Sequence, residues 1–156
     1  MPHFAFNKKL WEYGQEIEDR VMPVVNDLFD CNFEKNENDI FDYLDFKDHD
    51  KKVICEIKGR KVKSTQYDKT LITASKVTAG FKEIDDGYRV FFIFAFTDKL
   101  MKYELKEEDS FECKFTGTNC IAHYLIPIRE LIEITDTDFI HPENDPVMEE
   151  VNEKIN

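Results

Sequence analysis

Residues 88–96, with the sequence YRVFFIFAF, are the part of this chain that most restricts its fold. The apolar residues follow one another without the polar alternation of a half-buried strand, and such a run is typical of a strand covered on both faces. A sheet that is covered on both faces needs helices packed against each side. Two further stretches, residues 101–106 and 120–128, are predicted as additional strands. The sequence therefore predicts an α/β fold with a mixed central β-sheet flanked by helices.

A first helix is predicted over residues 8–29, because apolar residues recur there at helical spacing and should form one buried face. Pro23 lies within this segment, where proline removes a backbone donor and clashes with the preceding turn. We therefore expect a kink near residues 19–22 or two abutting helices. The apolar positions of the predicted buried face are Trp11, Ile17, Val21, Val24, Val25 and Leu28.

A second helix is predicted over residues 66–79. Thr65 suits its N-cap position, Asp68 suits the acidic position of a capping box, and Gly80 suits the end of the helix. Residues 129–134 are predicted to add one helical turn after the last strand.

The length of 156 residues, with 42% hydrophobic residues, fits one domain with a single core. We expect this domain to cover residues 1–134 and an acidic tail to follow over residues 135–156. No apolar run reaches the roughly 18 residues of a membrane span, and the N-terminal residues lack the apolar stretch of a signal peptide. The four cysteines form no CxxC pair, which is typical of reduced thiols. We therefore expect an intracellular, cytoplasmic protein, in the host cytoplasm if the chain is viral.

The net charge of −12 by itself disfavours a nucleic-acid partner, because a uniformly negative field repels phosphates. The charge is unevenly distributed, however. Residues 58–82 carry seven lysines and arginines and a single acid, so this segment has a charge of +6 and the remainder has −18. A basic segment within an acidic chain indicates a phosphate-facing surface, and the alternative is an ordinary solvated helix face.

Residues 40–46 and 52–58 are two compact apolar runs separated by KDHDK, and they are predicted to form a β-hairpin. Acidic residues inside such runs are costly unless something pairs with them. A turn that is symmetric about His49 pairs residues that are equally far from it on either side. In this register Asp42 lies directly opposite Glu56.

Asp42 and Glu56 then share one face of the hairpin, and Lys58 stands on that face two residues beyond Glu56. Two opposed carboxylates repel each other unless a cation lies between them. Mg²⁺ suits this place because it takes one or two carboxylates, keeps several waters and leaves positions for phosphate oxygens, and Mn²⁺ is the alternative ion. Lys58 could hold the attacking water or stabilise charge on the phosphate. The alternative is a structural ion pair between Glu56 and Lys58, with Asp42 exposed at the edge of the sheet.

The pattern of Asp42, a hairpin and then Glu56, Ile57 and Lys58 resembles the core of the PD-(D/E)xK nuclease superfamily. The resemblance covers roughly residues 14–96. It implies a restriction-endonuclease-like core and Mg²⁺-dependent hydrolysis of phosphodiester bonds in DNA.

Within this superfamily the sequence is most similar to the archaeal-type Holliday-junction resolvases, whose first helix carries a Gly-x-x-x-Glu pattern that Gly14 and Glu18 match. Phe41 stands where the motif has its proline. Glu16 is the reserve for Glu18, and because the two lie about 200° apart on a helix, only one of them can face the hairpin. An exposed helix acid is the alternative interpretation of Glu18.

The resemblance implies a role for each matching residue. Asp42 and Glu56 hold the metal, the carbonyl of Ile57 is a further ligand, and Glu18 completes the metal site. Lys58 lies at the nucleophilic water. The side chains predicted to contact phosphates, by their charge or polarity and their position beside this site, are Arg60, Lys61, Lys63, Gln66, Lys69 and Lys76.

The sequence and the resemblance together predict a Mg²⁺-dependent DNA endonuclease. Its substrate stays open between branched DNA, a short duplex sequence, and a flap or single-strand end. We expect a homodimer, because cutting two strands commonly takes two active sites. Two other hypotheses remain: a non-catalytic nucleic-acid-binding or assembly protein on a nuclease scaffold, and an acidic protein that recruits a basic partner or mimics DNA.

Overall fold

The structure, a computed structural model, describes residues 8–35, 44 and 46–135 of the chain. No helix in this part is long and apolar enough to cross a membrane. In chain order the elements are α1 (Lys8–Phe29), β1 (Glu34–Lys35), β2 (Phe46–Asp48), β3 (Val53–Gly59), β4 (Lys69–Thr73), α2 (Ala74–Asp85), β5 (Arg89–Ala95), β6 (Leu100–Leu105), β7 (Glu112–Thr116), β8 (Ile121–Pro127), the 3₁₀ turn η1 (Ile128–Glu130) and β9 (Ile132–Thr135).

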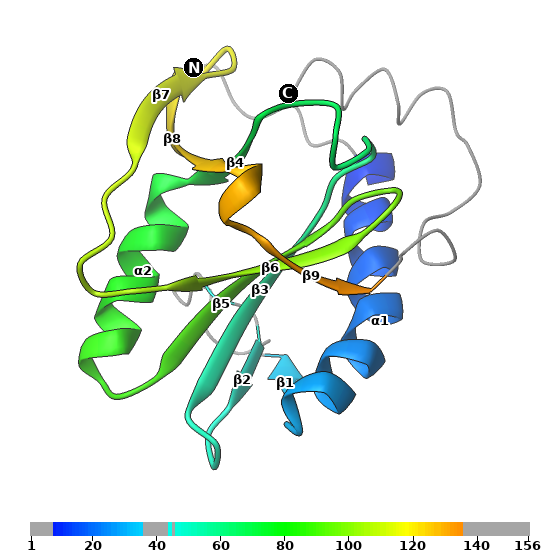
Figure 1. The fold of residues 1–156 in the computed structure, drawn as a ribbon, viewed down its shortest axis with the longest axis vertical. Coiled ribbons are helices and arrows are strands. Elements are labelled where there is room, and N and C mark those ends of the chain that lie inside the picture. The colour runs from blue at the N-terminus through cyan, green and yellow to red at the C-terminus, as the bar shows by residue number, and fades with distance from the viewer. Residues whose placement is uncertain (1–7, 36–43, 45, 136–156) are drawn as a thin grey trace.

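The described strands form two sheets. The central sheet has the order β1-β2-β3-β5-β6-β9, and the smaller sheet has the order β4-β8-β7. β3 and β5 run parallel, whereas the other neighbouring strands run antiparallel. The two helices lie on opposite faces of the central sheet, with α1 in blue and α2 in green (Figure 1). The predicted α/β fold with a mixed central sheet and helices on both faces is confirmed.

β5 is the middle of the core, as its continuous apolar sequence predicts. Phe91 and Ile93 belong to the apolar cluster on the α1 face of the sheet, while Phe92 and Phe94 belong to the cluster on the α2 face. All four side chains are at least 98% buried. β3 has the same division, since Ile57 packs toward α1 and the neighbouring even-numbered positions face α2. The direction in which each β3 side chain points follows from this alternation.

The first helix begins and ends where the sequence predicts. It runs without a break through Pro23, so the expectation of two abutting helices is wrong. Its buried face is the four-residue stripe of Tyr13, Ile17, Val21 and Val25. Two of the positions predicted for the buried face are instead more than half exposed, namely Trp11 at 55% and Leu28 at 53%.

The second predicted helix is wrong in its first half. Residues 69–73 form β4, which pairs with β8, and α2 begins only at Ala74. Gly80 lies inside this helix rather than at its end, and a Cβ there would come within 2.7 Å of Leu105 Cδ2. The helix ends at Asp85, and Gly87, whose φ of +94° suits glycine, follows the C-cap residue Asp86. The N–H of Gly87 donates to Ile84 O and that of Tyr88 to Glu83 O, which completes a Schellman motif.

The hairpin register predicted from a turn about His49 is also wrong. That turn would pair Phe46 with Lys52, but the structure pairs Phe46 with Cys55. The shift is three residues, an odd number, so it exchanges the two faces of one strand relative to the other. Asp42 lies outside the described residues, so its predicted pairing with Glu56 is not tested directly.

The side chain of Asp48 sets the observed turn. Its Oδ1 accepts hydrogen bonds from the N–H groups of Asp50 and Lys51, both at 3.0 Å, and its Oδ2 accepts one from Asn32 N at 2.8 Å. The turn then closes through Lys52, which has a positive φ of 60°. These backbone donors, that of Asn32 first, hold the pKa of Asp48 below its ordinary value of 3.8.

We expect Asp48→Asn to weaken the acid sensitivity of folding. A carboxylate whose pKa is lower in the folded than in the unfolded state stabilises the fold above its ordinary pKa of 3.8, and this stabilisation is lost as the pH falls through the folded value. Urea unfolding at pH 7 and at about pH 3 measures the difference. The variant should be less stable than the native chain at pH 7, and the two should converge at the acidic pH. Asp50→Asn, in an exposed position of the same turn, is the control, and parallel curves for the native chain and Asp48→Asn would contradict the prediction.

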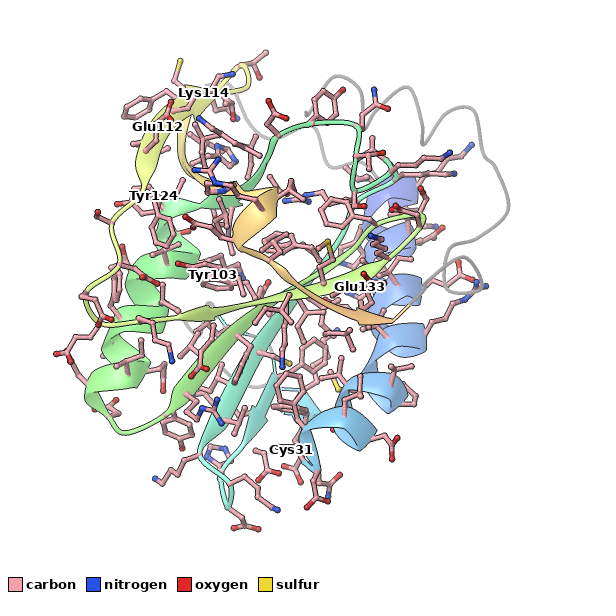
Figure 2. All side chains as sticks on the ribbon, viewed as in Figure 1. Cys31, Tyr103, Glu112, Lys114, Tyr124 and Glu133 are labelled. Carbon is pink, nitrogen blue, oxygen red and sulfur yellow. The ribbon has the colours of Figure 1, made fainter. Side chains whose placement is uncertain are left out.

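The small sheet and the last strand were not predicted in full. Of its three strands the sequence indicated only β8, and the predicted helical turn over residues 129–134 is a short 3₁₀ turn followed by β9. Phe111 joins the two sheets, because its ring lies 5.8 Å from that of Tyr103 in β6 and 5.7 Å from that of Tyr124 in β8. Figure 2 labels both tyrosines on their separate sheets. The tail from residue 136 onward lies outside the described residues.

Candidate functional site

The sequence Glu56-Ile57-Lys58 occupies the C-terminal end of β3. Glu56 is 1% exposed, although a carboxylate is seldom buried unless it is paired. Lys58 Nζ lies 3.4 Å from Glu56 Oε1, and Lys76 Nζ, from the first turn of α2, lies 3.2 Å from the same oxygen. One carboxylate and two ammonium groups thus lie together on the face of the sheet that α2 covers. A buried ion pair of this kind offsets the cost of removing each charge from water only while all partners are present.

A cleft of about 300 Å³ lies on the other side of β3, between the strand end and α1. It contains three residues of the predicted site, Glu18, Ile57 and Lys58. Lys58 therefore belongs to both the buried charge cluster and the cleft. The residues that line the cleft are Leu10, Trp11, Tyr13, Gly14, Gln15, Glu18, Ile57, Lys58, Gly59 and Arg60.

Glu18 faces this cleft from α1 and is mostly buried, with 12% of its side chain exposed. Lys35 Nζ lies 3.3 Å from Glu18 Oε2 and also donates a hydrogen bond to Gln15 Oε1 at 2.7 Å. The interpretation of Glu18 as an ordinary exposed helix acid is therefore wrong. Glu16, the reserve, instead forms an ion pair with Arg20 along the helix surface and does not line the cleft.

The structure brings some predicted site residues together and separates others. Glu56 does not line the cleft, because its side chain points to the α2 face while Glu18 lies on the α1 face. Lys58 lines the cleft, but its ammonium group pairs with Glu56. Asp42, the remaining predicted ligand, lies outside the described residues.

Three of the predicted phosphate contacts have structural roles instead. Arg60 donates from Nη2 to Leu71 O at 2.5 Å, and burial lowers the pKa of this guanidinium to about 10. Lys61 is 7% exposed, with its Nζ 5.9 Å from the centroid of the Tyr13 ring. Lys76 pairs with Glu56 as described above. The residues of this predicted set that remain exposed are Lys63, Gln66 and Lys69, and Lys69 pairs with Glu112 at 2.8 Å.

The loop that follows β3 is held against the end of β5. Thr97 N donates to Val62 O at 3.0 Å, and Asp98 accepts from both the N–H and the hydroxyl of Ser64, at 2.7 and 2.8 Å. Partial burial acts to raise the pKa of Asp98, but the two bonds from Ser64 outweigh it and hold that pKa below the usual range. The loop and its exposed Lys63 are therefore anchored beside the cleft.

Sequence reasoning did not assign Trp11 or Gly59 to the cleft. Trp11, Gly14 and Glu18 are three and four residues apart and so share one helix face, which is a signal the sequence does contain. Gly59 gave no such signal. A Cβ at Gly59 would lie 3.2 Å from both Ile17 Cγ1 and Tyr13 Cε1, so its missing side chain lets α1 approach the strand closely.

We expect Gly59→Ala to lower the free energy of unfolding by about 1–2 kcal/mol, because the crowding of a tightly packed contact exceeds what alanine gains over glycine in a strand. The substitution also pushes α1 away from the end of β3. Urea unfolding measures the loss. Gly14→Ala is the matched control, since a Cβ there would meet no atom of the described residues within 4 Å. A variant of Gly59 as stable as that control would show that the helix does not need this close approach.

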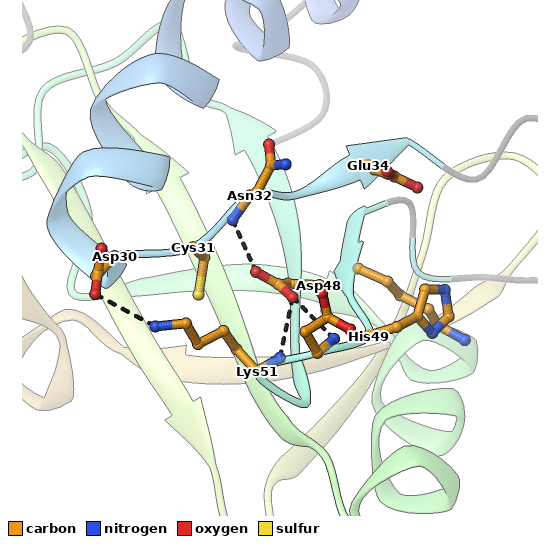
Figure 3. A pocket seen from close by; sticks show the side chains of 9 residues that line it. Asp30, Cys31, Asn32, Glu34, Asp48, His49 and Lys51 are labelled. Carbon is orange, nitrogen blue, oxygen red and sulfur yellow. Dashed lines mark hydrogen bonds and ion pairs between the residues drawn. The ribbon is translucent and has the colours of Figure 1, made fainter.

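Another cavity, of about 490 Å³, lies at the opposite end of the sheet, by the β2–β3 turn. Figure 3 shows its wall, including Asp48 with its backbone donors and the ion pair of Lys51 with Asp30. No residue of the predicted site lines this cavity. Asp48 is engaged in the turn, and Lys51, Lys47 and His49 have partners in Asp30, Glu83 and Tyr88, so we assign this cavity no part in the proposed chemistry.

The carboxylate oxygens of Glu56 are donors of the type that a hard divalent cation binds. Among the described residues no three histidine, cysteine or acidic side chains lie close enough together to hold a metal ion. Mg²⁺ needs fewer, because it is commonly bound by one or two carboxylates together with waters and substrate phosphates. The buried carboxylate of Glu56 meets that requirement in part and would exchange a lysine contact for the ion.

None of the protein-family models, curated proteins and solved structures compared with the chain matches it.

Proposed function

We propose that this protein is a metal-dependent nuclease with a restriction-endonuclease-like core of the PD-(D/E)xK type, hydrolysing phosphodiester bonds in DNA. The observation that carries the proposal is the buried carboxylate of Glu56, 3.4 Å from Lys58, at the end of a central strand that opens into a cleft. A buried carboxylate paired with an ammonium group in such a place is a candidate for chemistry rather than for stability alone.

The order of the elements supports the same proposal. A long helix, a hairpin whose second strand ends in Glu-Ile-Lys, and a helix on the opposite face follow one another along the chain, as the resemblance implies. The strand after the second helix, β5, lies parallel to β3 and directly beside it.

Each residue would then have a defined task. Glu56 would hold Mg²⁺ or Mn²⁺ together with the carbonyl of Ile57 and with Asp42, as the resemblance implies, whereas Glu18 lies on the other face of β3 and would not reach the same ion. When bound, such an ion lowers the pKa of a water molecule and neutralises charge on the phosphate. Lys58 would orient the attacking water by donating a hydrogen bond to it. The exposed residues Lys63, Gln66 and Lys69 would bind the DNA backbone without reading sequence.

A second candidate is a non-catalytic nucleic-acid-binding protein that keeps this fold as a scaffold. Lys76 favours it, because two ammonium groups on one carboxylate oxygen compensate the charge of Glu56 without any metal ion. The two candidates differ in a simple observable, since only the first cuts DNA.

The test is incubation of the full chain with labelled plasmid, linear duplex, single-stranded and four-way-junction DNA, in Mg²⁺, Mn²⁺ or EDTA. We expect cleavage with either metal ion and none in EDTA. DNA binding without cleavage under every condition would favour the scaffold function, and neither binding nor cleavage would favour the acidic interaction protein. Light scattering of the same sample tests the expected homodimer.

A further inference from the structure

We propose that the cleft between α1 and β3 binds an unpaired base, with Trp11 as the stacking surface. The substrate class is then single-stranded DNA or a single-stranded stretch within a larger DNA. This inference rests on the proposed nuclease function and narrows its substrate.

Trp11 is the first observation. It is the single tryptophan of the chain, its side chain is 55% exposed, and it lines the same cleft as Lys58. A large aromatic ring exposed beside cationic groups is the arrangement that binds bases of single strands, because every base has a π-face and every nucleotide has a phosphate. The bases of a duplex have both faces covered by their neighbours, so an unpaired base is the partner that this ring fits.

Gly14 is the second observation. It lies one helical turn after Trp11 and lines the same cleft. Glycine within a helix weakens it, and it often marks a place where another molecule approaches the backbone closely. A Cβ built at Gly14 would meet no atom of residues 8–35, 44 or 46–135 within 4 Å, so packing within this part of the protein does not account for the glycine. The space it leaves is open toward the cleft.

The local charge is the third observation. The chain carries −12 in total, which disfavours DNA over most of its surface. The charged residues that line the cleft are two cations, Lys58 and Arg60, and one anion, Glu18. Lys35 pairs with Glu18, and Lys61 lies over the ring of Tyr13, another lining residue. The acid of the cleft is thus compensated by Lys35, while the Lys58 ammonium pairs with Glu56 and the Arg60 guanidinium donates to Leu71 O, so the cleft carries no uncompensated acid that would repel the phosphates beside a stacked base.

The direct test uses the fluorescence of Trp11, because no other tryptophan contributes to it. The full chain is titrated in EDTA with an oligothymidylate of about 12 nucleotides, within the span that single-strand-binding folds occupy. We expect the single strand to quench the emission and a duplex of the same length to leave it nearly unchanged. Equal quenching by duplex and single strand, or none by either, would overturn the inference.

Variants separate the stacking role from general effects on the surface. By anisotropy of the labelled oligothymidylate, we expect Trp11→Ala to weaken binding about tenfold or more, and Trp11→Phe to recover part of the loss. Leu28→Ala is the matched control, since Leu28 is a similarly exposed apolar residue on the same helix and does not line the cleft. An equal loss in Trp11→Ala and the control would overturn the proposal.

Gly14→Leu tests independently whether the base binds in this cleft. Leucine favours a helix more than glycine does, so the melting temperature should stay the same or rise, while its side chain enters the cleft and weakens binding of the single strand. Unchanged affinity would show that the cleft is not where the base binds. Cleavage assays distinguish the two proposals: cutting of DNA without any response of Trp11 overturns this inference alone, whereas quenching without cutting in Mg²⁺ overturns the nuclease.

Discussion

Replacing Lys58 with methionine is expected to slow metal-dependent DNA cleavage by about 10²–10⁴-fold, the range found when one positioned catalytic group is lost. Methionine keeps most of the length and apolar volume of the lysine stem, and Glu56 keeps its second partner, Lys76, at 3.2 Å. The fold should therefore survive while the ammonium group at the proposed water is lost. Single-turnover cleavage with excess protein measures the chemical step apart from binding.

Lys63→Met is the matched control for this prediction, because it removes the same charge from an exposed position of the loop that follows β3. We expect it to weaken DNA binding modestly and to leave the single-turnover rate unchanged. If Lys58→Met cut DNA as fast as this control, Lys58 would be a structural partner of Glu56 and the proposed role would be wrong.

Glu56→Leu is expected to lower the free energy of unfolding by about 3–5 kcal/mol, the usual result of removing one partner from a buried ion pair. The carboxylate is 1% exposed, and its partners Lys58 and Lys76 have side chains that are only 32% and 18% exposed. Leucine fills much of the volume but leaves two ammonium groups close together with no carboxylate between them. Urea unfolding of the variant measures the loss.

The companion variant combines Glu56→Leu with Lys76→Met. Because Lys76 is the less exposed of the two lysines, removing it should restore a large part of the lost stability. Lys82→Met, an exposed lysine of α2, serves as the control in the same background. Equal stability of the two double variants would show that the cost of Glu56→Leu arises from packing and not from unpaired charge.

The elements that the sequence predicts well are those whose signals are long and local. The helical spacing of α1 extends over 22 residues, and the apolar run of β5 covers seven strand residues, so each is recognisable without knowledge of the rest of the fold. The prediction of a helix over residues 66–79 was wrong in its first half, because it relied on a capping-box pattern at Thr65. The pairing of β4 with β8, which is distant in the sequence, makes residues 69–73 a strand instead. Thr70 and Ile72 are β-branched residues, which favour a strand, and both are buried in β4 against β8. The sequence analysis gave this signal less weight than the capping-box pattern.

The sequence predicted those residues of the candidate site that a motif identifies. It did not predict the residues whose side-chain orientation depends on how the helices pack against the sheet. Glu56 and Lys58 follow from their strand spacing, and their contact at 3.4 Å agrees with it. The contact of Lys76 with Glu56 depends on where α2 begins, which the sequence did not show. The exposure of Trp11 depends on which stripe of α1 packs on the sheet, and a hydropathy pattern alone assigned it to the core.

The pairing of β4 with β8 has a consequence for synthesis of the chain on the ribosome. Thr73 pairs with His123, so β4 must wait for about fifty further residues, which takes several seconds at about 5–20 residues per second. Among the described strands β8 is the one neighbour of β4, so until then β4 has no partner in this part of the chain. An uncovered strand edge is prone to pair with other chains. A nascent chain that has not yet reached residue 121 should therefore depend on chaperones. Fragments that end before residue 121 should aggregate, although they contain both helices.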